Sequence, residues 1–149
     1  MVEQVPLVAQ IDIQKMRQLY LSEFQLVRET IRQDYLGTEY IFKRESDSEI
    51  LIMQIGIEKS DKDAQADILY YLKDISGVLT SGPHLGVSVG DEYWWRAKFE
   101  HANLLEHIAF VRKNVLITME TTNYDELESL AKKIDDDILN RASYITYKE

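Results

Sequence analysis

One order of patterns occurs twice in the chain: an apolar strand, a polar turn, a second apolar strand and then an amphipathic helix. The first copy spans about residues 37–76 and the second about residues 104–140. The paired strand segments are Tyr40–Arg44 with Ile50–Gln54, and His107–Arg112 with Val115–Met119. A duplicated unit of this kind predicts an α+β fold in which both helices lie on one face of an antiparallel sheet, related by approximate twofold repetition. It carries no information about chemistry.

The length and composition fit a single domain. The chain has 149 residues, of which 45% are hydrophobic and 29% charged, and a chain of this size can bury a core without disulfides or metals. No Pro-, Gly- or Ser-rich linker divides it, and we expect the connection Ser76–Pro83 to join the two copies at the surface. The chain has no cysteine, which excludes thiol catalysis, disulfides and cysteine-based metal sites.

The net charge of −9 argues against two classes of partner. Proteins that bind nucleic acid cluster Lys and Arg against phosphates, whereas here these residues are scattered and the dense charge run, Asp135–Asp137, is acidic. The same net charge disfavours anionic lipid surfaces. No run of about 18 apolar residues occurs, so we expect no membrane insertion by this segment.

The spacing of apolar residues predicts two main helices. The first runs from Asp61 to Ile75, and Ser60 followed by Asp63 resembles a capping box at its start. The second runs from Asp125 to Asn140. Their inner faces should supply the centre of the core, which we expect to contain Leu72, Ile75, Leu127, Leu130 and Ile134 opposite Ile52 or Met53 and Ile117 or Leu116.

The remaining apolar segments indicate strands, because they are short, rich in β-branched or aromatic residues and bounded by turn signals. The expected strands are Phe24–Ile31, Gly37–Arg44, Glu49–Ile57, Leu85–Val89, Tyr93–Phe99, Glu106–Arg112 and Asn114–Thr121. The segment Ile11–Leu21 is ambiguous and permits a short helix. The predicted fold is therefore α+β, with an antiparallel sheet of six to seven strands and two main helices on one face.

Aromatic residues are most concentrated at Tyr93, Trp94 and Trp95. On a strand, Tyr93 and Trp95 share one face and Trp94 takes the other. A ring on the face away from the helices could line a pocket for an apolar or sugar-like ligand. The alternative, which we favour, is that all three rings serve the core, because aromatic residues suit pleated surfaces in general.

Three histidines, His84, His101 and His107, are candidate metal ligands or general bases. A site that forms in three dimensions with Glu100 or Glu106 stays open. We favour the interpretation that these histidines are surface or half-buried residues near strand ends, because a catalytic assignment depends on geometry. The chain contains no phosphate loop, nucleophile elbow or zinc-protease motif, and we expect no cofactor and no metal.

The run Asp135–Asp137 raises the question of a calcium site. Calcium loops alternate their oxygen ligands and contain a glycine for the turn, whereas these three carboxylates are consecutive on an expected helix. We therefore expect them to lie on a solvated helix face.

Four segments carry a pattern of turns and apolar positions: Gly37–Tyr40, Val89–Glu92, Phe110–Val115 and Leu127–Ile138. In these segments the chain resembles a loose group of prokaryotic extracytoplasmic, lipoprotein-like domains. The resemblance covers roughly residues 37–139, and it departs at Lys113, where glycine is usual in the group. It implies an α+β fold and an extracytoplasmic location, and it brings no catalytic residues with it.

Three functions follow from these observations. We expect a non-enzymatic domain that binds an unknown protein or small-molecule partner at Tyr93, Trp94, Trp95 or His107. The alternative is a small-molecule enzyme with a pocket near Trp94 or Trp95 and His101 or His107. In the third interpretation, an exposed sheet edge receives another chain. A pocket with convergent polar groups and perturbed pKa values would favour the enzyme.

Overall fold

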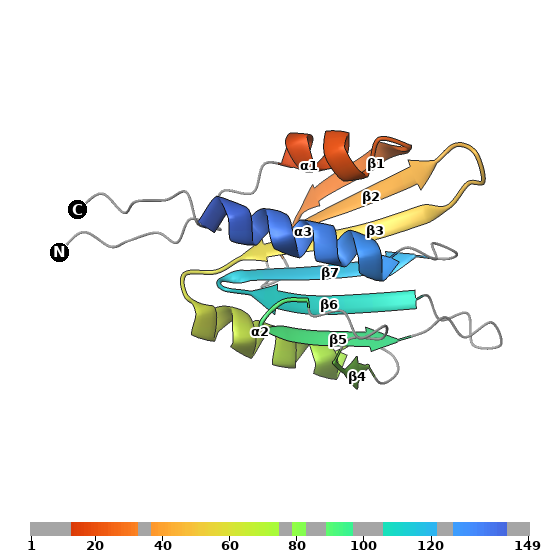
Figure 1. The fold of residues 1–149 in the computed structure, drawn as a ribbon. Helices are drawn as coiled ribbons and strands as arrows, with labels where there is room; N and C mark the ends of the chain where they lie inside the picture. Colours follow the sequence, from red (N-terminus) through yellow and green to blue (C-terminus); the bar gives the residue numbers. More distant parts are fainter. Residues whose placement is uncertain are drawn as a thin grey trace.

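The computed structural model describes residues 13–32, 37–74, 79–82, 89–96, 106–121 and 127–142. Within these ranges the chain forms seven strands and three helices (Figure 1). In chain order they are α1 (Ile13–Tyr20), β1 (Phe24–Ile31), β2 (Thr38–Arg44), β3 (Ile50–Ile57), α2 (Asp61–Asp74), β4 (Thr80–Ser81), β5 (Glu92–Arg96), β6 (Glu106–Arg112), β7 (Val115–Thr121) and α3 (Leu127–Ala142).

All seven strands belong to one sheet, in the order β1-β2-β3-β7-β6-β5-β4, and every neighbouring pair is antiparallel. Two meanders, β1-β2-β3 and β4-β5-β6-β7, meet where β3 pairs with β7. The strands therefore come together as short hairpins around one central junction. The predicted α+β class with a single antiparallel sheet is confirmed.

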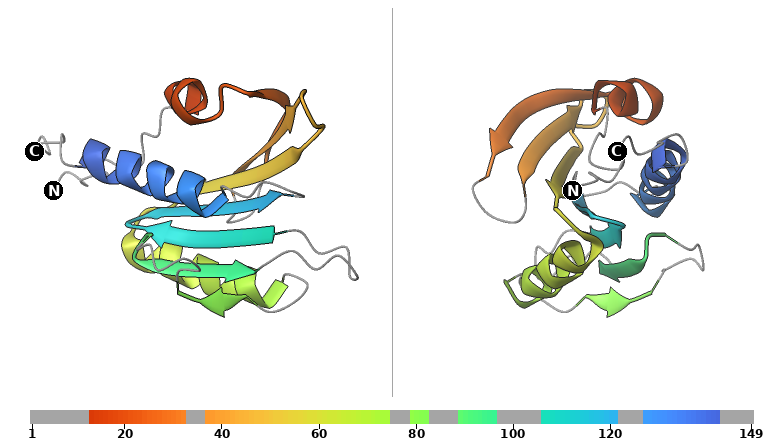
Figure 2. Two further views of the ribbon diagram at one scale, coloured as in Figure 1. Left: turned by 45° about the vertical axis from the view of Figure 1, so that its right-hand side comes forward. Right: turned by 90° about the vertical axis from the view of Figure 1, so that its left-hand side faces the viewer.

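The sheet is buried on both faces by helices, as the alternation along β6 shows. Ile108 and Phe110 belong to a core cluster with α3, whereas Ala109 and Val111 belong to a second cluster with α2. Figure 2 shows α2 and α3 on opposite sides of the sheet. We call these two sides the α2 face and the α3 face. The short helix α1 covers the α3 face as well, through the buried side chain of Met16.

The prediction that both main helices share one face is therefore wrong, and the twofold repeat is not supported. A twofold repeat that pairs β3 antiparallel with β7 requires a twofold axis perpendicular to the sheet. Such an axis would place both helices on the same face. The repeat makes Ile52 and Ile117 equivalent, but they lie on opposite faces. Ile117 packs in the core cluster with α3. The β3 neighbours of Ile52, Leu51 and Met53, belong to that same cluster, so the side chain of Ile52 lies on the other face. The physical reason is that β6 and β7 carry apolar side chains on both of their faces, so both faces must be covered by other elements.

The boundaries of the elements follow the local signals closely. The strand ends predicted for β1, β2, β3, β6 and β7 differ from the structure by at most one residue. Helix α2 is described to Asp74, and α3 spans Leu127–Ala142, two residues past its predicted end at Asn140. The predicted end of α2 at Ile75 and the predicted start of α3 at Asp125 lie outside the described residues. The Asp63 N–H donates to the Ser60 Oγ over 3.1 Å, which confirms the predicted cap of α2. The sequence reasoning missed β4, while residues 85–88 and 97–99 of two predicted strands lie outside the described ranges.

The predicted core is largely confirmed. Leu127, Leu130 and Ile134 of α3 are buried, at 0%, 2% and 1% exposure. Leu72 is only half-buried, because it lies at the margin of the cluster under α2, and Ile75 lies outside the described residues. None of the helices in the described ranges is long and apolar enough to cross a membrane.

Candidate functional site

The aromatic residues of β5 are divided between the two faces of the sheet. Tyr93 is buried on the α3 face, and its hydroxyl donates to the Glu128 Oε2 over 2.7 Å. Burial and the Glu128 carboxylate raise the pKa of the Tyr93 hydroxyl, so it stays a neutral donor. Trp95 packs half-buried on that same face, and Trp94 packs half-buried on the α2 face. Both sides of β5 thus contribute to cores, and the three rings do not face a common space.

His107 lies on the α2 face of β6 and is 1% exposed, so the expectation of a surface or half-buried side chain is wrong for this histidine. The reason is that β6 lies inside the sheet, under α2. Its Nε2 forms a short hydrogen bond with the Tyr71 hydroxyl of α2. Burial, assisted by the nearby Arg96 guanidinium, lowers the pKa of His107 to about 3. The ring is therefore neutral near neutral pH. His84 and His101, the other two candidates, lie outside the described residues.

The acid beside His107 is Glu120 of β7, which sequence reasoning did not single out. The two residues are cross-strand partners, with 3.7 Å between His107 Nε2 and Glu120 Oε1. Burial raises the pKa of the Glu120 carboxyl; Arg96 opposes the shift and the negative charge of Glu39 adds to it. Of the two acids proposed from the sequence, Glu106 alternates onto the α3 face and Glu100 lies outside the described ranges.

A row of hydrogen-bonded polar side chains crosses the α2 face next to Glu120. Thr118 of β7 donates to the Gln54 Oε1 over 2.8 Å, and the Gln54 Nε2 donates to the Glu39 Oε2 over 3.2 Å. Arg28 and Arg32 then reach Glu39 from the β1 side, at 3.7 Å and 3.8 Å between nitrogen and oxygen. We call these five residues the polar row; it spans β7, β3, β2 and the β1 edge.

The polar row was predictable only in part. Gln54 is a polar residue within the apolar strand β3, and Thr118 is a polar residue within β7. Each position therefore indicates a polar contact on one face of its strand. Their partnership joins residues 64 apart in the chain and depends on β3 pairing with β7. Without that pairing, nothing in the sequence connects Gln54 to Glu120 or His107.

Two isoleucines lie in the same row of the sheet as Glu120, next to the row that contains Glu39, Gln54 and Thr118. Ile52 of β3 is the cross-strand partner of Glu120, and Ile41 of β2 is the partner of Ile52. Both side chains are half-buried. Helix α2 contacts β6 and β7, toward the end of the sheet away from β1 and β2 (Figure 2). The candidate site is therefore a sheet surface on which two apolar side chains border the two carboxylates: Ile41 lies two residues from Glu39 on β2, and Ile52 lies beside Glu120. We call these two isoleucines the apolar floor.

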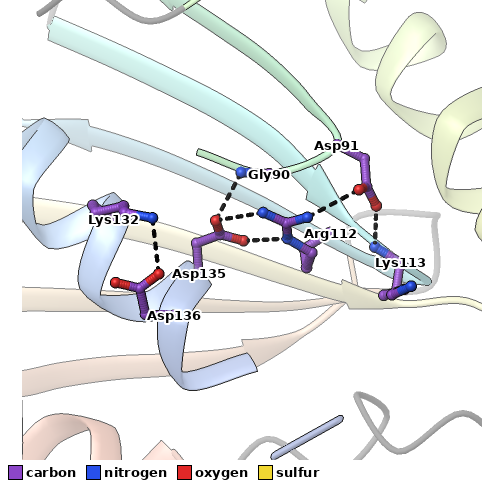
Figure 3. Close-up of polar contacts among 7 residues, drawn as sticks. All are labelled: Gly90, Asp91, Arg112, Lys113, Lys132, Asp135 and Asp136. Carbon is purple, nitrogen blue, oxygen red and sulfur yellow. Dashed lines mark hydrogen bonds and ion pairs between the residues drawn. The ribbon is translucent and has the colours of Figure 1, made fainter. Parts of the chain in front are cut away.

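A second polar cluster ties α3 to two turns (Figure 3). Arg112 donates to Asp135 twice, from Nε over 2.7 Å and from Nη2 over 2.8 Å, and Asp135 also accepts the Gly90 N–H over 2.9 Å. Asp91 accepts from Arg112 Nη1 and from the Lys113 N–H. All of these groups satisfy one another, so the cluster serves the structure. The expected solvated position of Asp135 is wrong, because its carboxylate is completely buried.

No group of three or more histidine, aspartate or glutamate side chains in the described part of the chain is arranged to hold a metal ion. Comparison with known proteins adds no relative: no family model matches the chain, and neither a curated protein nor a solved structure matches it. The resemblance to extracytoplasmic domains stays a prediction.

Proposed function

We propose that this protein is a non-enzymatic binding domain that holds a cationic group of its ligand on the α2 face, between Glu39 and Glu120. The observation that carries the proposal is the state of Glu120. Its carboxylate is half-buried, at 32% side-chain exposure, and no hydrogen bond from another described residue reaches it. Half-buried carboxylates normally have donors, because burial without them costs free energy. A ligand that brings a donor would remove that cost.

The electrostatics of the site favour a positively charged donor. The pKa of Glu120 is raised by burial and by Glu39, so a cation placed near both carboxylates would stabilise the ionised form of each. His107 beside Glu120 is neutral, and the Arg96 guanidinium opposes the upward shift of the Glu120 pKa only in part. The Gln54 amide holds Glu39 in position, and such fixed geometry lowers the entropic cost of binding.

The apolar floor indicates what accompanies the positive charge. Ile41 and Ile52 are half-buried beside the two acids, so a ligand that also covers them would remove apolar surface from water. An alkyl amine or an alkyl guanidine has this combination, as do the side chains of lysine and arginine. We therefore infer an organic cation with an apolar arm, either a free small molecule or the side chain of a protein partner.

The enzyme alternative has less support at this site. A general base works best with a pKa near the working pH and within reach of its substrate. His107 is 1% exposed, its Nε2 is engaged by Tyr71, and its pKa is lowered to about 3. The histidine that the sequence proposed as a catalyst thus serves as a neutral part of the packing under α2.

The test compares two ligands of nearly the same shape, one with a positively charged guanidinium group and one with a neutral ureido group. N-acetyl-arginine methylamide and its neutral isostere N-acetyl-citrulline methylamide would each be titrated into the protein and followed by NMR at Ile41, Ile52 and Glu120. We expect the arginine compound to bind at least roughly tenfold more tightly, a difference of about 1.4 kcal/mol. Glu120→Gln should lose that preference, because it removes the negative charge and keeps the shape.

The control is Asp136→Asn, which removes one negative charge from α3, far from the site; Asp136 pairs with Lys132 there. This variant should bind like the wild type. Equal binding of the arginine and citrulline compounds, or an unchanged preference in Glu120→Gln, would overturn the proposal. A basic peptide that binds where free arginine does not would identify the ligand as a protein side chain.

A further inference from the structure

We infer that the outer edge of β1 binds an extended segment of a different polypeptide, which adds an eighth strand to the sheet and places an acidic side chain opposite Arg28. This surface borders the α2-face site, because Arg28 also lies 3.7 Å from Glu39, but the inference does not depend on the function proposed for that site.

The first argument is the direction of the backbone groups in β1. Among the described strands, β1 lies at the end of the sheet and has β2 as its one neighbour. The Arg32 N–H donates to the Gly37 carbonyl over 2.7 Å, which identifies Arg32 and Gly37 as a hydrogen-bonded pair. Because such pairs alternate along an antiparallel ladder, Glu29 and Ile31 must direct their N–H and C=O groups away from β2. These groups form a short template for another strand.

The second argument is the apolar surface along this edge. Ile31 is 79% exposed and Val27 is 61% exposed. Val27 is the extra residue of a β-bulge, since the register passes from Leu26 opposite Phe42 directly to Arg28 opposite Ile41. The bulge leaves the stretch Arg28–Ile31 regular and able to pair. A strand added there would cover Ile31, and this burial of apolar area favours binding.

The third argument is charge, and it specifies the partner. The Arg28 guanidinium is 64% exposed and lies 3.7 Å from Glu39. Glu39 also accepts a hydrogen bond from the Gln54 amide over 3.2 Å, so its carboxylate is shared between Gln54 and Arg28. Opposite charges at directly facing positions of paired strands stabilise the pairing, whereas like charges destabilise it. A carboxylate opposite Arg28 would therefore improve on the present long contact.

The same rule argues against a second copy of this chain. Antiparallel pairing of two copies about Glu29 places this charge opposite itself. Pairing about Thr30 places Arg28 opposite Arg32 of the other copy. These are the registers that use the regular stretch most fully, and each brings like charges together. The occupant is thus an unlike chain with an acidic residue flanked by apolar ones.

The test uses the peptide Ac-Thr-Val-Thr-Val-Glu-Val-Thr-NH₂ and a matched peptide with lysine in place of glutamate. Binding would be followed by NMR, with amide hydrogen exchange measured on the wild-type protein. We expect saturable binding of the glutamate peptide, new protection of the Glu29 and Ile31 amides, and at least roughly tenfold weaker binding of the lysine peptide. Glu120→Gln should bind the glutamate peptide like the wild type, which separates this surface from the α2-face site.

Two variants test the backbone contribution. Ile31→Pro removes an outward N–H without breaking the β2 ladder, a position at which an edge strand tolerates proline; it should lose at least roughly tenfold in peptide affinity. Ile31→Val keeps the N–H and should stay within about threefold. The inference is overturned if no saturable binding occurs up to roughly 1 mM peptide, or if the protected amides lie elsewhere. Exchange in the wild type decides the matter even if Ile31→Pro does not fold.

Discussion

The Arg112 guanidinium and the Asp135 carboxylate form a two-point ion pair, with Nε 2.7 Å from Oδ1 and Nη2 2.8 Å from Oδ2. Asp135 is completely buried, so the pair lies under α3 rather than on the surface (Figure 3). Because Asp135 also accepts the Gly90 N–H, one carboxylate joins α3 to the end of β6 and to the turn before β5. It fixes how α3 lies on its face of the sheet.

Removal of Arg112 should therefore be costly. Arg112→Met leaves the Asp135 carboxylate buried without its cation, and we expect the free energy of unfolding to fall by about 3–5 kcal/mol in a denaturant titration. The double variant Arg112→Met with Asp135→Leu should recover most of that loss, because it removes the stranded charge. The control Lys132→Met breaks a surface pair with Asp136 and should change stability by under about 1 kcal/mol. Similar losses in the two single variants would contradict this role for the buried pair.

Burial under α3 can be tested at Leu130, which is 2% exposed. Leu130→Ala should lower the free energy of unfolding by about 2–5 kcal/mol, the usual cost of a cavity at a buried leucine. Leu72→Ala is the matched control, because Leu72 is half-buried under α2 and should lose less. A loss well under about 1 kcal/mol at Leu130 would mean that α3 does not pack as described.

The turn between β6 and β7 holds Lys113 at a φ of 55°. This left-handed conformation is unfavourable for residues with a Cβ by roughly 1–2 kcal/mol, and the bond from the Lys113 N–H to Asp91 helps to hold it. Lys113→Gly keeps that bond and removes the Cβ, so thermal or chemical unfolding should show a gain of about 1 kcal/mol. Lys133→Gly, the same change within α3, should instead lose about 1 kcal/mol. A loss in both variants would show that the strain at Lys113 is negligible.

The hairpins were predictable from the sequence and the placement of the helices was not, for one reason. Turn signals and apolar runs are local, so the ends of β6 and β7 follow from residues such as Lys113 and Asn114. Which face a helix covers depends on whether the strands need cover on one side or on both. The side chains of Ala109 and Leu116 pack with α2. In the sequence, however, apolar residues at these positions are equally compatible with a sheet that has helices on one face.

The candidate site shows the same limit. The cluster of Tyr93, Trp94 and Trp95 attracted attention because three aromatic residues are adjacent in sequence, and strand alternation sends them to two faces. Glu120 and Gln54 attract none, because each is one polar residue in an apolar strand. Their relation arises only when β3 pairs with β7, a contact between the two halves of the chain.

Two titrating groups should change the free energy of unfolding with pH in opposite directions. The first is His107. Its folded pKa is lowered to about 3 from the ordinary 6.5, chiefly by burial. Between these values the unfolded chain binds a proton that the folded chain does not, so the free energy of unfolding rises with pH and levels off near pH 6.5. His107→Gln should remove this rise in denaturant titrations across that range. A profile that keeps the same rise would mean that His107 is protonated in the folded protein.

Glu58 supplies the opposite slope. Burial and the neighbouring Asp67 and Asp63 raise its pKa from 4.5 to about 7. Between these values the folded chain keeps a proton that the unfolded chain has lost, so this contribution to the free energy of unfolding is present at low pH and is lost as pH rises through about 7. Glu58→Gln mimics the protonated form and should remove the fall, leaving the rise from His107. Denaturant titrations from about pH 4 to about pH 8 measure both slopes. A Glu58→Gln profile parallel to that of the wild type would show that Glu58 is already ionised in the folded protein.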